Sequence, residues 1–437
     1  MRRLFFYTCA ALLTFSGGPV EAGGDDDAFF KDTIQAMQER IKQLEEEVRQ
    51  LKSQPIPTPT PTAAPDLGPI EQRLKGLEDG LGLLKGIEVG GMVYGSYNYN
   101  FNNPDTKDNS LRIFDTRANN FTLDLAQLSI SKQEDDGVGF KLLVDYGRTA
   151  GLIQSDWTGD GSLSNGTNNF ALQEAYITYT APFGKGVGVK AGKFVTLLGA
   201  EVIEAPLNYN ISRSFLFGFA IPFTHTGLLL SYPLHDMVSL TAGVVNGWDN
   251  VIDSNKGKTF LGSLGFTPMD SLSWTFNGVY GAEQVDRGGS KRGVFDTVLT
   301  YTPIEYLDLV LNYDYGSETG LLEGSKTAEW YGVAGIIGIG GALFNPDWEA
   351  FSLAQRAEWF SDRDGTRTGT SQDLWELTTT LKWKLTENLH VRFEYRHDES
   401  DRKSFSQKRI RVTPDGPEYR FLRGQDTIAT ELSYSFY

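Results

Sequence analysis

Residues Lys193–Thr226 read KFVTLLGAEVIEAPLNYNISRSFLFGFAIPFTHT, a stretch that is too irregular for a strand or helix and too long for a tight turn. Short segments of alternating apolar and polar residues lie on both sides of it, which is the pattern of a sheet with two different faces. A connection of roughly thirty residues without regular structure inside a compact domain usually has a functional role. We therefore interpret Lys193–Thr226 as a loop folded into a wide β-barrel, where it narrows the channel. The alternative is an exposed surface loop.

The segments that surround this stretch alternate between apolar and polar side chains from Ile87 to Tyr437, and they predict sixteen strands. In Leu389–Arg396, LHVRFEYR, every second residue is apolar and the residues between are His, Arg or Glu. Such a strand has one apolar and one polar face. Soluble β-sandwiches alternate in the same way, so alternation alone does not choose between a sandwich and a barrel.

The lengths of the connections make that choice. Short links follow every second strand, at Glu134–Gly137, Phe183–Lys185, Pro233–Asp236, Pro268–Ser271, Pro303–Tyr306, Asn345–Trp348 and Thr386–Asn388. Long polar links fall between them, at Asn102–Asn120, Arg148–Asn169, Asn246–Lys258, Gln284–Lys291, Gly316–Thr327, Asp362–Gln372 and Glu399–Gly424, with Lys193–Thr226 as the third of the series. Strict alternation of this kind is typical of an outer-membrane barrel with short periplasmic turns and long external loops.

A sheet in a membrane has to close on itself, because each embedded backbone group needs a hydrogen-bond partner. We expect Thr427–Tyr437 to pair with Ile87–Phe101. This pairing completes an all-β, antiparallel transmembrane β-barrel of about sixteen strands, a number that leaves an aqueous lumen. A hairpin around Pro414-Asp415-Gly416 would raise the count to eighteen, but we assign it to the last external loop.

The residues before the barrel predict four further segments. Residues 1–22 form a secretory signal peptide, with a basic start, an apolar segment and a small-residue cleavage site at Ala22. Residues 23–53 form a periplasmic coiled coil, since apolar residues recur at alternating spacings of four and three, at Ile34, Met37, Ile41, Leu44, Val48 and Leu51. A lone amphipathic helix is the alternative. Residues 54–69 are a Pro/Thr-rich linker, 70–86 a short amphipathic helix and 87–437 the barrel.

Composition excludes several classes of function. The 437-residue chain has a formal charge of −16, which argues against a nucleic-acid partner. Its single cysteine, Cys9, lies in the predicted signal peptide, so we expect no disulfide in the mature protein. The sequence has no catalytic or phosphate-binding motif, and its four histidines are too dispersed to suggest a metal site. We expect no enzyme activity, cofactor or metal, although a barrel enzyme could assemble its residues from different strands.

Charges that face the lumen are the candidate selectivity residues. Glu201, Glu204 and Arg213 lie in the predicted constriction loop. The polar faces of the predicted strands add Arg356, Lys382, Arg392 and Arg396 late in the chain, and Asp145, Glu174, Asp308 and Asp314 earlier. Basic groups opposite acidic ones would impose a transverse field that orders water and disfavours apolar solutes. The alternatives are that the strand charges only solvate a wet lumen, and that Glu201 or Arg213 pairs with the barrel wall.

Several short motifs carry a resemblance to a known family. They are Gly192-Lys193-Phe194, Gly199-Ala200-Glu201, Asn208, Ser212-Arg213-Ser214, Pro222–Gly227, Asn246-Gly247-Trp248-Asp249, and Arg356–Phe360 followed by Asp364-Gly365. From Ile87 to the C-terminus the chain thereby resembles the OmpL-like putative β-barrel porin-2 family of Gram-negative outer membranes. The resemblance implies a porin but no particular solute.

Two hypotheses of function follow. The leading one is passive diffusion of small hydrophilic solutes or ions through a water-filled barrel. The alternative is a structural anchor, in which a plugged barrel holds the coiled coil and links the outer membrane to the peptidoglycan. The expected partners are outer-membrane lipid, further copies of the chain in a dimer or trimer, and the barrel-assembly machinery, which reads an aromatic C-terminal residue such as Tyr437.

Overall fold

The structure is a computed structural model that describes residues 86–134, 137–158, 169–322, 326–413 and 416–436, together with Glu39, Lys42, Gln43, Glu46 and Arg49. The chain divides into two compact units, Met1–Gly80 and Leu81–Tyr437. In the first unit the five described residues are helical. The predicted signal peptide, the apolar seam of the coiled coil, the linker and residues 70–85 lie outside the described residues. No helix among the described residues is long and apolar enough to cross a membrane.

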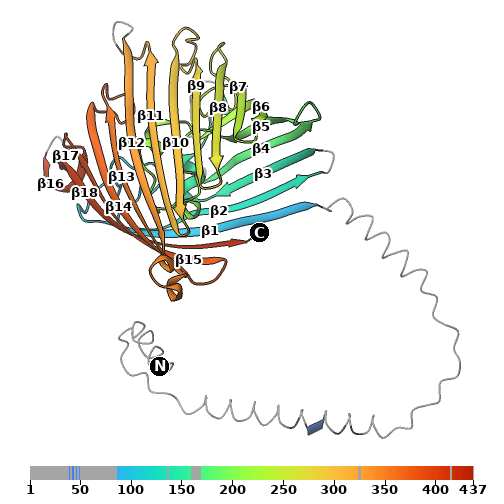
Figure 1. Ribbon diagram of the computed structural model, residues 1–437. Coiled ribbons are helices and arrows are strands. Elements are labelled where there is room, and N and C mark those ends of the chain that lie inside the picture. The colour runs from blue at the N-terminus through green and yellow to red at the C-terminus, as the bar shows by residue number, and fades with distance from the viewer. Residues whose placement is uncertain are drawn as a thin grey trace. The chain divides into compact units, whose positions relative to one another are not determined.

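The second unit is built around a closed antiparallel β-barrel (Figure 1). Its strands are β1 (Ile87–Asn100), β2 (Asn120–Gln133), β3 (Val138–Tyr146), β4 (Phe170–Ala181), β5 (Val187–Val195), β6 (Thr224–His235), β7 (Val238–Val245), β8 (Thr259–Met269), β9 (Leu272–Gly281), β10 (Arg292–Ile304), β11 (Leu307–Thr319), β12 (Thr327–Gly340), β13 (Phe351–Asp362), β14 (Gln372–Lys384), β15 (Leu389–Ser400) and β18 (Gly424–Phe436). Each strand pairs with its neighbour in the chain, and β18 lies between β15 and β1. Among the described residues the barrel therefore has sixteen strands, as predicted.

The barrel closes where the ends of the chain meet. β1 pairs with β18 from Gly91 opposite Phe436 to Asn100 opposite Thr427. The two extra strands, β16 (Phe405–Thr413) and β17 (Gly416–Leu422), form a separate two-stranded sheet in the connection between β15 and β18. The prediction that this hairpin belongs to the last long loop is confirmed.

The faces of the barrel are inverted relative to a soluble protein. On β15, Phe393 and Tyr395 are 47% and 45% exposed, whereas the inward-facing Arg392 and Arg396 are 1% exposed each. An apolar outer surface and a polar interior are stable when the outside is hydrocarbon and the lumen holds water or polar groups. The alternation seen in the sequence thus places its charged residues inside.

Several connections differ in detail from the prediction, and Pro268 and Pro303, which were expected in turns, lie inside β8 and β10. Pro233 lies inside β6, near its end, because the ladder with β7 continues to the His235–Val238 pair, with an irregularity after Pro233. The turn is therefore shorter than Pro233–Asp236. The link between β12 and β13 contains two 3₁₀ turns, η4 (Gly341–Leu343) and η5 (Pro346–Trp348).

The long third connection is also shorter than its predicted bounds. The β5–β6 ladder extends from Gly188 opposite Ser231 to Val195 opposite Thr224, so only Thr196–Phe223 leaves the sheet. We call this segment loop 3. It contains the 3₁₀ turn η1 (Ala205–Leu207) and the π-helical turn η2 (Leu216–Ala220). The second long connection begins with the short helix α3 (Arg148–Leu152).

Candidate functional site

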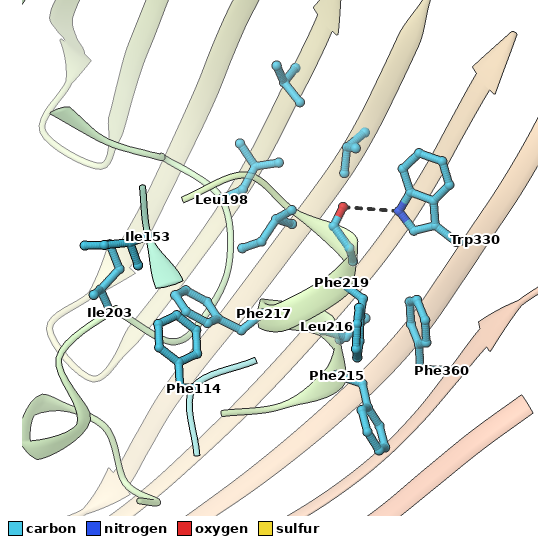
Figure 2. Close-up of a cluster of buried hydrophobic side chains, with 14 of the residues drawn as sticks. Phe114, Ile153, Leu198, Ile203, Phe215, Leu216, Phe217, Phe219, Trp330 and Phe360 are labelled. Atoms are coloured by element: carbon cyan, nitrogen blue, oxygen red, sulfur yellow. Dashed lines mark hydrogen bonds between the residues drawn. The ribbon is translucent and has the colours of Figure 1, made fainter. Parts of the chain in front are cut away.

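Loop 3 leaves the wall between β5 and β6 and crosses the inside of the barrel to strands that lie several positions away. The Asn210 side chain donates to Thr380 on β14 (Nδ2 to Oγ1, 2.7 Å). The Trp330 indole on β12 donates to the Ala220 carbonyl (Nε1 to O, 3.1 Å), the bond drawn as a dashed line in Figure 2. Loop 3 therefore contacts inward-facing residues of the wall, which an exposed surface loop could not reach.

One part of loop 3 is an apolar block. Phe215, Leu216, Phe217 and Phe219 are between 0% and 9% exposed and lie around η2. They pack with Leu198 and Ile203 of loop 3 itself and with residues of the wall and of other long connections, as Figure 2 shows: Phe114, Ile153, Trp330 and Phe360. Burial of a large apolar side chain contributes about 1.5–3 kcal/mol, so this packing holds η2 against a lumen that would otherwise be wet.

Close approach of η2 to the wall depends on a glycine. A Cβ atom added at Gly332 on β12 would lie 2.9 Å from Leu216 Cδ2 and 2.5 Å from the Trp359 carbonyl oxygen. A larger residue there would force β12 and β13 to shift, because the Trp359 backbone oxygen cannot yield, and it would also press on the Leu216 side chain.

Carboxylates of the wall accept hydrogen bonds from the backbone of the loop. Glu394 accepts from the amides of Ile211 (2.5 Å) and Ser212 (3.0 Å). Glu358 accepts from the amides of Phe215 and Leu216, each at 2.6 Å. Charged acceptors make hydrogen bonds roughly twice as strong as neutral ones. They satisfy amides that have no strand partner.

Three arginines of the wall donate hydrogen bonds to backbone carbonyls of the loop. Arg356 binds the Ser212 carbonyl (2.7 Å), Arg392 those of Asn208 (3.0 Å) and Asn210 (3.2 Å), and Arg396 that of Arg213 (2.6 Å). Each arginine also pairs with an acid on the wall, at 2.6–2.7 Å: Glu376, Glu431 and Asp398 respectively. The backbone of residues 208–216 is therefore bound to the wall along its length. These hydrogen bonds go to side chains of the wall and not to the backbone of a neighbouring strand.

The three candidate residues of loop 3 are buried, at 6–7% exposure. Glu201 pairs with Arg356 (2.7 Å) and accepts from the Ser214 amide (2.8 Å). Glu204 accepts from two amide side chains, Gln127 (2.8 Å) and Gln173 (2.7 Å). Arg213 donates to the carbonyls of Ile203 and Ile211 and covers the Phe114 ring, with its guanidinium carbon 4.6 Å from the ring centroid.

Two cavities flank loop 3, and Leu207 borders both of them. The first, about 320 Å³, lies against β1–β5, and its charged lining residues are Lys141, Glu174, Glu201 and Glu204. The second, about 350 Å³, lies against β11–β14 and is lined by Asp308 and Lys382. Neither cavity is lined by Arg213, Arg356, Arg392 or Arg396. Five of the sequence candidates therefore line one of these cavities: Glu174, Glu201, Glu204, Asp308 and Lys382.

Sequence reasoning missed several residues that hold loop 3. Glu358 lies two positions after Arg356, and Glu394 lies between Arg392 and Arg396, so all of them face the lumen. The spacing of two between charged residues on one strand could have identified Glu358 and Glu394 as lumen-facing. Asp145, by contrast, was singled out and has a wall partner, since the Gln127 amide donates to it at 3.0 Å. Asp314 faces Asp296 on the adjacent strand.

The external end of loop 3 is fixed by other connections. Arg367 donates to the Phe219 carbonyl (2.6 Å) and lies over the rings of Trp248 and Trp330, 4.9 and 5.1 Å from their centroids. Burial among these groups lowers the pKa of Arg367 to about 10. Asp249 accepts from the amides of Phe223 (2.9 Å) and Thr224 (2.8 Å), and burial raises the pKa of its carboxyl.

Within the described residues no group of three or more His, Cys, Asp and Glu side chains is placed to hold a metal ion. The arrangement consists instead of an inward loop, a charged wall and two cavities.

Comparisons with known proteins agree on the barrel. The profile of a family described as "Putative beta-barrel porin-2, OmpL-like" matches residues 86–436. The solved structures of similar fold include an anion-selective porin from Comamonas acidovorans (11% identity, TM-score 0.54, covering 80% of this chain and 99% of that one). They also include the outer membrane channel DcaP of Acinetobacter baumannii (11%, TM-score 0.51, 80% and 97%) and the trimer form of OmpT, an outer membrane protein of Vibrio cholerae (11%, TM-score 0.52, 80% and 99%). No curated protein matches the sequence. At these identities the likeness to solved structures shows the fold alone.

Proposed function

Because the chain belongs to the OmpL-like putative beta-barrel porin-2 family, we propose that this Gram-negative outer-membrane barrel is a porin through which small hydrophilic solutes or ions diffuse passively. The observation that carries the proposal is loop 3, which enters the lumen, is attached to the wall and leaves two cavities beside it. A loop held in this way limits the size of solutes that pass.

Charge selection follows from which residues reach the cavities. Glu201 and Glu204 line the first cavity and favour cations there, whereas Asp308 and Lys382 place opposite charges at the second. Arg213, Arg356, Arg392 and Arg396 act on selectivity indirectly, because they set the position of the loop. The long connections face the cell exterior and the short turns face the periplasm, in keeping with outer-membrane barrels.

Single-channel recording tests the proposal. Purified protein in planar lipid bilayers should give stable open steps, and reversal potentials in a salt gradient should report cation preference. A protein that inserts as a folded barrel and remains silent would contradict the porin and favour an anchoring role for the barrel. We propose no enzyme activity.

Self-association is a second part of the proposal. The apolar seam Ile34, Met37, Ile41, Leu44, Val48 and Leu51 predicts a periplasmic coiled coil that joins copies of the chain, as a dimer or trimer. The trimer form of the Vibrio cholerae protein with a similar fold supports an oligomer of barrels. Binding of the coiled coil to peptidoglycan is compatible with a pore. Chemical cross-linking of the intact protein tests the association.

A further inference from the structure

The first cavity has an apolar side that a passage for purely hydrophilic solutes does not require. Met92 and Leu143 line it from the wall, and Val202 and Leu207 line it from loop 3. Val202 and Leu207 are 41% and 59% exposed, whereas the apolar residues around η2 are at most 9% exposed. Exposed aliphatic surface costs about 25 cal/mol per Å², so a partner that covers these side chains gains that free energy.

The same cavity is also lined by hydrogen-bond acceptors. Glu204 is 7% exposed and takes its hydrogen bonds from two neutral amides, Gln127 and Gln173. No lysine, arginine or histidine of the described chain forms an ion pair with it within 4.0 Å. Lys141, which also lines the cavity, is already paired with Glu174 at 2.7 Å. Among the described residues, Glu204 is thus a buried carboxylate that forms no ion pair with a lysine, arginine or histidine.

A second acceptor beside Glu204 has no donor at all. Gln173 is 1% exposed and lines the cavity, and its Oε1 atom has no hydrogen-bond partner. A buried polar atom that lacks a partner costs about 1–3 kcal/mol. Gln127 extends the acceptor network to Asp145, whose Oδ2 atom also has no partner. The site therefore lacks a group that donates several hydrogen bonds and carries positive charge.

We propose that this cavity binds small amphiphilic amines, with the ammonium group on Glu204 and Gln173 Oε1 and the hydrocarbon part against Met92, Leu143, Val202 and Leu207. The inference deepens the proposed function and rests on it only for the claim that such amines are solutes of the channel. An ammonium group has three donors, which match the acceptors available. A volume of about 320 Å³ lies at the lower end of the range for ligand sites, which restricts the ligand to a small molecule.

The same features disfavour other ligands. No group of three or more His, Cys, Asp and Glu side chains among the described residues is placed to hold a metal ion, and calcium, for instance, takes six to eight oxygens. An inorganic cation also leaves Val202 and Leu207 uncovered. A carboxylate of the same size would face the charges of Glu201 and Glu204.

The experiment compares three molecules of one chain length: n-pentylammonium, pentanoate and 1-pentanol. Binding to the purified full-length protein in detergent is measured by isothermal titration calorimetry, with blank titrations into micelles. We expect the amine to bind at least tenfold more tightly than either control. Glu204→Gln should weaken amine binding roughly tenfold or more, since a hydrogen bond to a charged group is worth about 1.5–3 kcal/mol. Val202→Ser should weaken it severalfold and leave the preference for amine over pentanoate in place.

Matched controls separate the site from general effects. Glu387→Gln removes an exposed carboxylate from the β14–β15 turn, and Val285→Ser removes an exposed valine from the loop between β9 and β10; both should bind the amine like the unaltered protein. Equal binding of pentanoate and pentylammonium, no binding of the amine, or unchanged binding by folded Glu204→Gln and Val202→Ser variants would overturn the inference. Parallel bilayer recordings keep the two claims apart. A conducting channel without amine binding refutes only the inference, and amine binding by a silent barrel refutes only the porin.

Discussion

Removal of the Arg356 guanidinium should release loop 3 from the wall. Arg356 is fully buried and forms ion pairs with Glu201 and Glu376, each at 2.7 Å. It also donates to the carbonyl and the hydroxyl of Ser212, at 2.7 and 3.3 Å. Arg356→Met keeps most of the side-chain volume and removes all of these interactions.

The free-energy cost of Arg356→Met comes from the two buried carboxylates that lose their partner. Glu201 and Glu376 are 7% and 1% exposed, and the substitution leaves both without their shared cation. Breaking a buried ion pair by removing one partner costs about 3–5 kcal/mol. Glu201 gains more water when its part of loop 3 leaves the wall. At 1.4 kcal/mol for each factor of ten, the detached state should rise roughly a hundredfold to several thousandfold relative to the attached state.

Bilayer recordings of Arg356→Met should therefore show larger conductance steps and frequent fluctuations between levels. Arg402→Met is the matched control, because Arg402 lies beyond β15 with its side chain 59% exposed, and it should behave like the unaltered protein. The double variant Arg356→Met with Glu201→Gln removes one uncompensated charge. Its conductance should fluctuate less than that of Arg356→Met alone. Folding of each barrel is checked by heat-modifiable migration on gels.

Steady, unchanged conductance of a folded Arg356→Met barrel would refute the reasoning. It would mean that the apolar block around η2 and the other two arginines hold loop 3 without Arg356. Arg356 would then have no part in gating the channel.

Four further outcomes are expected. Glu201→Gln with Glu204→Gln should lower the cation-over-anion permeability ratio, by roughly fivefold per charge if each is worth about 1 kcal/mol, and an unchanged reversal potential would contradict this. Shortening loop 3 between Glu201 and Arg213 should raise conductance with the barrel intact; equal conductance would show that loop 3 is not the narrowest point. Deleting residues 30–51 should leave a folded barrel and reduce cross-linked oligomers, so undiminished cross-linking would remove the coiled coil from assembly. Because burial raises the pKa of Asp249, the native state binds its proton more tightly than the unfolded chain. Stability against proteolysis at this junction should therefore increase as the pH falls from neutral through that raised pKa, and Asp249→Asn should abolish the dependence; a loss of stability over the same range would contradict it.

The barrel could be predicted because its strands and turns are marked by patterns within short stretches of the sequence. Alternation in segments such as Leu389–Arg396 gives the two faces, and the series of short and long links gives the strand number and closure. Boundaries failed where pairing overrides residue preference, as at Pro233, which the β6–β7 ladder includes.

The inward path of loop 3 was also predictable, since its phenylalanines needed an apolar surface. Its partners were not. The contact between Glu201 and Arg356 joins residues 155 positions apart, and only the completed barrel brings them together. Phe114, which packs on Phe217 with ring centroids 5.7 Å apart, belongs to a different connection whose sequence carries no signal for that contact.

The attachment of loop 3 by side chains sets the order in which the protein can be completed. Ser212 is made 144 residues before Arg356, and Arg213 precedes Arg396 by 183. Contacts of such long sequence separation form late, because the intervening chain must be ordered first. Until β13 and β15 have joined the sheet, loop 3 has no wall arginines to bind. Loop 3 is therefore fixed in the lumen only by a sheet that already includes these late strands.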